Sequence, residues 1–172
     1  MVMQCFFSNL ISMESLNYRV GNGIDVHPLK KGRKLILGGI HIQHDYGCDG
    51  HSDGDVVVHS IIDSILGALN VGDIGSHFPS NNQKYKDINS CELLKTVFDK
   101  YNFTIINIDS TIILQEPMIQ PYIVKIKKKI SDILKTKNIS IKATTTDHLG
   151  FIGSKQGVAA LTTCMLINND KN

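Results

Sequence analysis

The chain has 172 residues, 42% of them hydrophobic, which suits a single globular domain with its own core. Its net charge of +2 provides no strong field for a polyanion, and no stretch approaches the roughly 20 continuous apolar residues that span a bilayer. We therefore expect neither a nucleic-acid partner nor a membrane partner.

The cysteines and arginines narrow the chemistry further. The four cysteines lie far apart and form no Cys-x-x-Cys pair, which suits a reducing compartment and argues against a cysteine zinc ribbon. Arg19 and Arg33 are the only arginines among 18 basic residues, so most positions lack the guanidinium fork that favours phosphate recognition.

Patterned sequence begins near Tyr18, so we expect residues 1–17 to be a leader or disordered tail and residues 18–172 to form the domain. In chain order, strands are predicted over residues 18–27 and 34–42, where the Gly38-Gly39 pair indicates a bulge or tight bend. A helix is predicted over residues 53–70, with Asp53 or Asp55 as its cap.

The second half continues the interleaving of strands and helices. Helices are predicted over residues 90–101 and 118–136, and strands over residues 104–115, 139–146 and 158–168. No repeat or linker divides these elements. The fold class expected is α+β, of the α/β type: one domain whose mixed β-sheet is covered by helices on one face.

Three side chains form a candidate metal site. Asp25 and His27 lie two apart on a predicted strand, so their side chains share a face while Val26 turns into the core. His59 lies within the predicted helix, and Asp63, one turn on, is expected to accept the other ring proton of His59.

Two imidazoles and one carboxylate are the ligand count of a catalytic zinc site, which leaves a fourth position open. Spacing alone is weak support, because Asp-x-His pairs are common and a helix histidine is more often an ordinary surface or core residue.

The surrounding motifs resemble those of the 2-C-methyl-D-erythritol 2,4-cyclodiphosphate synthase family. The matching stretches are GNGIDVH (21–27), HSDGDV (51–56) with His59, Ser60, Asp63 and Gly67-Ala68, GDIG (72–75) with HFP (77–79), DSTII (109–113) with QEP (115–117), and KATTT (142–146) with LGF (149–151). Five motifs in family order make the resemblance specific, and it spans residues 18–168.

The resemblance implies a homotrimer around a central sheet-lined core, with active sites between subunits. The implied reaction converts 4-diphosphocytidyl-2-C-methyl-D-erythritol 2-phosphate, a cytidine nucleotide, to the cyclic diphosphate and releases CMP, in non-mevalonate isoprenoid synthesis. The substrate's own phosphate is the nucleophile, so the protein must mainly position two anionic groups and offset their charge.

Site roles follow from the matching positions. Zn²⁺ would be held by Asp25, His27 and His59, and a second ion, Mg²⁺ or Mn²⁺, by Asp147. His51 and Thr145 would stabilise the transition state. The implied substrate-binding residues are Val26, Ser52, Asp73, Ile74, Gly75, Phe78, Asn82, Leu114, Gln115, Glu116, Pro117, Met118, Ile119, Gln120, Thr144, Thr146 and Phe151.

Four positions depart from the family pattern. Asp147 replaces a usual glutamate, Met118 a lysine, Ser80 an aspartate and Ser154 an arginine, for which Lys155 supplies charge without the fork. None of these positions is a predicted zinc ligand. We therefore expect altered affinities with the same reaction.

Two other functions remain open from the sequence: a zinc-dependent phosphodiesterase that activates water, and a nonenzymatic trimeric scaffold with a structural metal. The unpatterned leader and a composition rich in lysine, asparagine and isoleucine favour a plastid-type organelle stroma, with a bacterial-type cytoplasm as the alternative.

Overall fold

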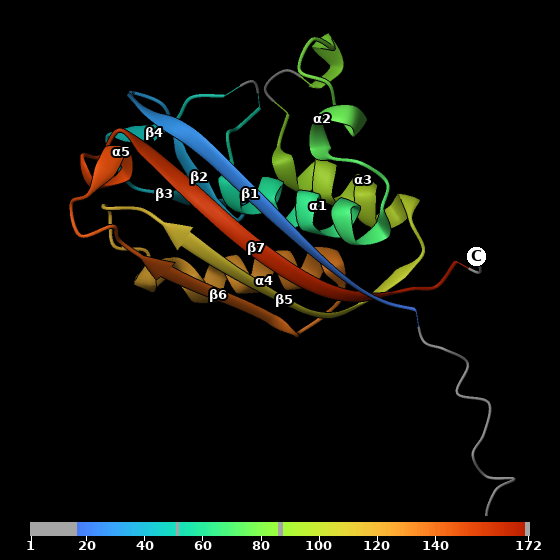
Figure 1. Cartoon of the computed structure of the whole chain (residues 1–172). Helices are drawn as coiled ribbons and strands as arrows, with labels where there is room; N and C mark the ends of the chain where they lie inside the picture. The colour runs from blue at the N-terminus through green and yellow to red at the C-terminus, as the bar shows by residue number, and fades with distance from the viewer. Residues whose placement is uncertain (1–16, 51, 86–87, 171–172) are drawn as a thin grey trace, which may run out of the picture.

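The computed structural model describes residues 17–50, 52–85 and 88–170. Its long strands form one five-stranded sheet in the order β4-β1-β7-β5-β6 (Figure 1). These strands are β1 (Tyr18–Lys31), β4 (Tyr46–Cys48), β5 (Phe103–Ile113), β6 (Ile139–Thr144) and β7 (Gly157–Asn168). Only β5 and β6 pair in parallel, so the sheet is mixed, as expected.

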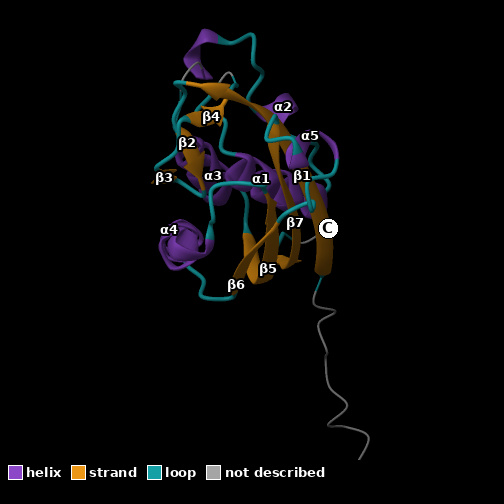
Figure 2. Cartoon of the chain, turned by 90° about the vertical axis from the view of Figure 1, so that its left-hand side faces the viewer, coloured by secondary structure: helices purple, strands orange, loops and turns teal. Residues whose placement is uncertain are grey.

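Three long helices cover one face of this sheet, which confirms the expected layering (Figure 2). They are α1 (Val56–Leu69), α3 (Ser90–Lys100) and α4 (Ile123–Leu134). Helix α1 packs directly on β1, where Gly21 and Gly23 make room: an added Cβ would lie 2.0 Å from the Ser64 carbonyl oxygen and 2.2 Å from that of Ser60. The glycines thus set how closely α1 approaches the first strand.

The stretch predicted as one strand over residues 34–42 is instead a hairpin of β2 (Leu35–Leu37) and β3 (Ile40–Ile42). The turn needs positive φ angles, 59° at Gly38 and 72° at Gly39, which glycine adopts without strain. The Asp55 carboxylate accepts hydrogen bonds from both glycine N–H groups, at 2.8 and 2.6 Å. It also caps α1 through Val57 and Val58, so one buried side chain joins hairpin and helix.

The other predicted elements differ from the structure mainly at their ends. The helix predicted from residue 118 begins at Ile123, because a 3₁₀ turn, η2 (Gln120–Tyr122), with a proline in its first turn precedes it. Three further short elements lack enough residues to show a period: α2 (Ile74–His77), η1 (Gln83–Tyr85) and α5 (Gly150–Gly153).

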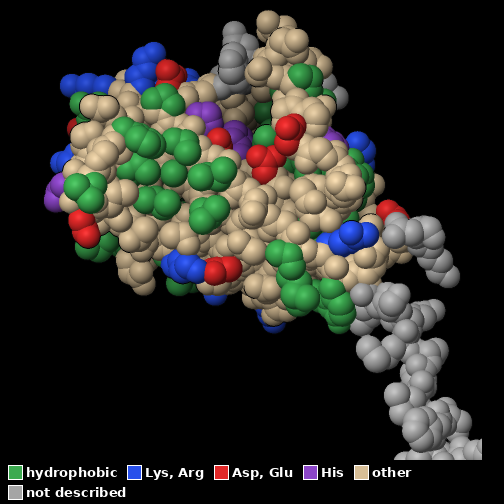
Figure 3. Space-filling model, viewed as in Figure 1, with side chains coloured by type: hydrophobic (Ala, Val, Ile, Leu, Met, Phe, Trp, Pro, Cys, Tyr) green, Lys and Arg blue, Asp and Glu red, His purple; other side chains and the backbone are tan. Residues whose placement is uncertain are grey.

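The sheet face opposite the helices carries exposed apolar side chains. Val20, Ile24 and Val26 of β1 are 67%, 63% and 44% exposed, and Leu161 of β7 is 46% exposed. Figure 3 shows this hydrophobic surface over β1 and β7. The prediction that Val26 turns into the core is wrong, because the helix-covered face of β1 is the one that bears Asp25 and His27.

Within the described part of the chain, none of the helices has both the length and the apolar character needed to cross a membrane.

Candidate metal centre

Asp25, His27 and His59 converge at the junction of β1 and α1. Each offers a ligand atom, and these atoms all lie within 4.8 Å of one another. Asp25 Oδ2 is 3.2 Å from His27 Nε2 and 2.9 Å from His59 Nδ1. The side chains are 22%, 19% and 12% exposed, respectively, so the cluster is sheltered but reachable from solvent. The triad can therefore hold a divalent metal ion.

The outward-facing ring nitrogens support this assignment. His27 Nδ1 donates to the Asp49 carbonyl oxygen at 3.0 Å, so Nε2, which faces Asp25, is the ring nitrogen that remains for an ion. His59 Nε2 lies 2.8 Å from Ser90 Oγ and 3.2 Å from Ser52 Oγ, on the side away from Asp25. Metal-binding histidines ordinarily use one nitrogen for the ion and the other for such a partner.

The electrostatics of the triad favour an anionic Asp25 next to imidazoles. Burial opposes ionisation of Asp25, but hydrogen bonds from His27 and His59 outweigh it and hold the pKa of this carboxyl far below its usual value. The hydrogen bond with Asp25 raises the pKa of His27, against the effect of burial. In the absence of metal, this hydrogen bond therefore favours the protonated form of His27 beside an anionic Asp25.

Asp63 does not have the expected role. Its Oδ1 accepts a hydrogen bond from the Ile74 N–H at 2.7 Å, at the start of α2, and the second ring nitrogen of His59 is bonded to serine hydroxyls instead. Burial raises the pKa of Asp63, and the Ile74 N–H opposes that shift. Asp63 and His59 are one helical turn apart, but the Asp63 carboxylate is bonded to the backbone at the start of α2.

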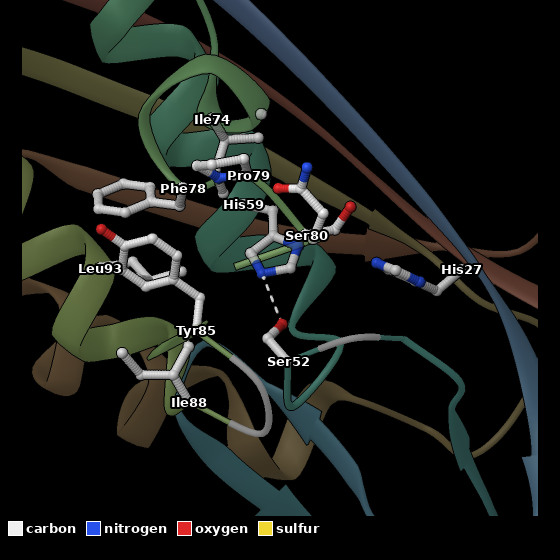
Figure 4. A pocket seen from close by; sticks show the side chains of 12 residues that line it. His27, Ser52, His59, Ile74, Phe78, Pro79, Ser80, Tyr85, Ile88 and Leu93 are labelled. Carbon is white, nitrogen blue, oxygen red and sulfur yellow. Dashed lines mark hydrogen bonds between the residues drawn. The ribbon is translucent and has the colours of Figure 1, made fainter. Parts of the chain in front are cut away.

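A cavity of about 460 Å³ opens beside the triad (Figure 4). Of the predicted site residues, those lining it are His27, His59, Ser52, Ile74, Gly75 and Phe78. Phe78 and Tyr85 meet edge to face with ring centroids 5.4 Å apart. They form an apolar part of the cavity lining, whereas His27, His59 and Ser52 form a polar part. Asp73 is the N-cap of α2, just before its first residue, and the Asn82 N–H donates to the Pro79 carbonyl oxygen in the following loop.

The remaining predicted site residues gather elsewhere, at the ends of β5 and β6 and around α5. The segments are joined by hydrogen bonds from the Leu114 N–H to the Thr144 carbonyl oxygen and from the His148 N–H to Gln115 Oε1. Thr145 Oγ1 lies 3.4 Å from Asp147 Oδ1. Neither Thr145 nor Asp147 lines the metal-side cavity.

The other members of this second group differ widely in exposure. Glu116 pairs with Lys155 at 2.7 Å, and the Glu116-Pro117 peptide bond is cis. Met118 and Phe151 are 77% and 51% exposed. Ile119 is buried, Gln120 begins η2, and Thr146 donates to the Leu149 carbonyl oxygen. His51 lies outside the described residues.

Sequence reasoning missed several residues of the metal-side cavity. Tyr85, Ile88 and Leu93 supply much of its apolar wall, and Ser90 contacts His59. They lie 26 to 34 residues from His59 in sequence, and no spacing rule connects them to it. The sequence placed Ser90 only as the first residue of the helix predicted over residues 90–101.

Comparisons with known proteins agree over almost the whole chain. The sequence profile of the YgbB family matches residues 18–167. The 2-C-methyl-D-erythritol 2,4-cyclodiphosphate synthase of Clostridioides difficile is 50% identical over 159 residues, which are 90% of this chain and 99% of the relative. That of Clostridium acetobutylicum is 53% identical over 154 residues, 87% of this chain and 99% of the relative.

Solved structures give the same result. The CDP complex of IspF from Plasmodium falciparum superposes with a TM-score of 0.75 at 36% identity, covering 90% of this chain and 99% of that one. The bifunctional IspDF of Campylobacter jejuni gives 0.86 at 42% identity, covering 91% of this chain and 44% of that longer chain. The chain therefore belongs to the YgbB family, whose curated relatives are 2-C-methyl-D-erythritol 2,4-cyclodiphosphate synthases.

Proposed function

We propose that this chain converts 4-diphosphocytidyl-2-C-methyl-D-erythritol 2-phosphate to 2-C-methyl-D-erythritol 2,4-cyclodiphosphate and CMP, a phosphorus–oxygen lyase reaction of isoprenoid synthesis. Family membership supports the reaction. The observation that carries the proposal is the triad of Asp25, His27 and His59 beside a cavity, with one ring nitrogen of each imidazole facing Asp25 and the other bound to a different partner.

The donor set fits Zn²⁺, because two imidazoles and a carboxylate match its preference and leave a position free. Such an ion supplies charge neutralisation and orientation to the attacking 2-phosphate. Asp25, His27 and His59 would hold the ion between β1 and α1, and Ser52 adds a hydroxyl to the lining of the cavity. Phe78 and Tyr85, which meet edge to face, would shield the sugar side from water and so strengthen the electrostatic interactions within the site.

The nucleotide half of the site is assigned to the second group of residues. The backbone of Leu114, Gln115, Glu116, Pro117, Met118, Ile119 and Gln120 would bind cytosine, and Thr144 to Thr146 the phosphates, with Phe151 closing the pocket. Asp147 would bind Mg²⁺ or Mn²⁺, and Thr145 and His51 would stabilise the transferring phosphoryl group. The Plasmodium falciparum relative solved with CDP supports a nucleotide ligand.

We further infer a homotrimer with active sites between subunits. Two observations support it: the second group does not line the metal-side cavity of its own chain, and the helix-free sheet face exposes Val20, Ile24, Val26 and Leu161. Burial of such a face against other copies would shield its apolar surface. A second copy would then bring its nucleotide-binding group to the first copy's metal.

Of the two compartments expected from the sequence, the plastid-type stroma finds no support among the curated relatives, which are bacterial. A bacterial-type cytoplasm fits those relatives.

The decisive assay supplies the diphosphocytidyl substrate together with Zn²⁺ and Mg²⁺. We expect CMP and a cyclic diphosphate in equal amounts. A linear hydrolysis product would instead indicate the phosphodiesterase, and no turnover with an intact metal-bound oligomer would indicate the scaffold. The scaffold is the less favoured of these, because structural zinc ordinarily has four protein ligands and the described residues provide three here.

A further inference from the structure

Ser90 is buried at the first position of α3, beyond the residues that hold the metal. It has no solvent exposure. Its Oγ lies 2.8 Å from His59 Nε2, and its hydroxyl also contacts Asp53 Oδ1. Its backbone N–H donates to Asp53 Oδ2 at 3.0 Å, so both oxygens of one carboxylate bind this residue.

The hydrogen-bond roles along this chain are fixed by elimination. The Asp53 carboxylate can only accept, so the Ser90 hydroxyl gives its single proton to Asp53. The Ser90 oxygen is then an acceptor toward His59, and His59 Nε2 must carry the proton between them. The ring nitrogen of His59 that remains for an ion is Nδ1, which faces Asp25 Oδ2 at 2.9 Å.

We propose that Ser90, held by Asp53, is a positioning residue that fixes the tautomer and ring orientation of His59 for metal binding. The proposal rests on the metal site assigned above. The chain Asp53–Ser90–His59 places a carboxylate behind the imidazole through one hydroxyl, an arrangement that orients a histidine ligand and increases its donor strength. It also ties the start of α3 to the metal, so α3 sets the position of a ligand that α1 carries.

The loop that carries Asp53 is itself held at several points. The Asp53 N–H donates to the Ile88 carbonyl oxygen at 3.3 Å, and the Asp55 N–H donates to Asp53 Oδ1 at 3.3 Å. Ser52 offers a second hydroxyl to His59 Nε2 at 3.2 Å, but it is only half-buried. Ser90 is the closer partner and the one bonded to a carboxylate.

The test compares the zinc dissociation constants of the parent protein, Ser90→Ala and Ser64→Ala, measured by competition with a chromophoric chelator. Ser64 is a matched control because it is equally buried, and its hydroxyl donates only to the Ile61 carbonyl oxygen in α1. We expect about 10- to 100-fold weaker binding for Ser90→Ala and a change of less than about twofold for Ser64→Ala. Both variants should lower the melting temperature of the metal-free protein, so the affinity separates positioning from packing.

A second measurement needs no variant. In zinc-loaded parent protein with ¹⁵N-labelled histidine, long-range ¹H–¹⁵N spectra should show His59 bound through Nδ1 and protonated at Nε2. Zinc on Nε2, or an unchanged dissociation constant in folded Ser90→Ala, overturns the proposal while leaving the metal site intact. A parent protein that binds no zinc overturns the metal site itself, and this inference with it.

Discussion

The Asp25 carboxylate lies between two imidazoles, and His59 supplies the only one of the three ligands that comes from a helix. Because α1 packs through its own apolar side, we expect His59→Ala to abolish tight metal binding and turnover while the fold persists. Metal content and circular dichroism check this. His41→Ala, an exposed position in β3, is the control, and unfolding specific to His59→Ala would contradict the account.

His27 makes the metal affinity pH-dependent. Its pKa is raised above 6.5 in the metal-free protein by Asp25, so below that raised value a proton must leave before an ion binds. We expect zinc affinity to fall as pH falls through this range, by up to about tenfold per pH unit. The metal-free protein has the opposite trend: protonated His27 stabilises it below the unfolded pKa, and this stabilisation is lost as pH rises through the folded pKa.

Zinc dissociation constants and urea denaturation of the metal-free protein, measured from about pH 5.5 to about pH 8, check both trends. An affinity that stays constant across this range would contradict the assigned protonation state of His27.

Arg33 is one of two arginines in the chain, and its guanidinium spans the loop that orients His27. Nε donates to the Cys48 carbonyl oxygen at 3.3 Å and an Nη to that of Gly50 at 3.2 Å. The intervening Asp49 carbonyl oxygen accepts from His27 Nδ1. Lysine lacks the fork, so we expect Arg33→Lys to weaken zinc binding by roughly threefold to tenfold.

The control for that prediction is Arg19→Lys, near the start of β1 and far along the strand from His27. Chelator competition on both variants gives the comparison. Equal affinities in Arg33→Lys, Arg19→Lys and the parent would show that the loop holds its conformation without the guanidinium.

At the scale of elements, Asp55 joins the β2–β3 hairpin to α1. Four backbone N–H groups donate to its buried carboxylate: those of Gly38, Gly39, Val57 and Val58. Asp55→Ala leaves these donors without partners, so we expect a loss of about 3 kcal/mol in the free energy of unfolding. Urea denaturation measures it.

Asp132→Ala is the matched control, because Asp132 forms only an exposed ion pair with Lys128 on α4. Its effect should stay within about 0.5 kcal/mol. Similar losses in the two variants would mean that the hairpin and α1 hold together without the Asp55 carboxylate.

The elements that sequence could predict were those long enough to show a period. Helices α1 and α3 and the long strands β1, β5 and β7 appear close to their predicted positions. Elements of three or four residues, such as β4 and α2, carry no such signal. Alternation in β1 showed that Asp25 and His27 share a face, but it could not show that Val26 belongs to the uncovered one.

The candidate site was predictable only where its residues lie close together in the sequence. Two ligands come from one strand, and their spacing is local, whereas His59 was connected to them through a family resemblance. The contacts of Ser90 and Asp53 with His59 depend on how α3 packs against α1, which no local pattern encodes. Asp63 lies one helical turn from His59, but its carboxylate accepts a hydrogen bond from the Ile74 N–H instead.

At the scale of the whole molecule, the uncovered sheet face should hold the proposed trimer together. Ile24 is 63% exposed on that face, and a charge there would have to be buried on assembly. We expect Ile24→Lys to yield monomers in size-exclusion chromatography with light scattering. Val124→Lys, at a position 78% exposed on α4, should leave the oligomer unchanged. Trimers in both variants would place the interface elsewhere.

The central claim is that Asp25, His27 and His59 share one ion and leave a coordination position free for the substrate phosphate. An anomalous difference map at the zinc absorption edge, from crystals soaked with a cytidine nucleotide, tests it most directly. The account predicts one strong peak in contact with Asp25 Oδ2, His27 Nε2 and His59 Nδ1, the three atoms that already face one another. No peak there, or a fourth permanent protein ligand on the ion, would contradict it.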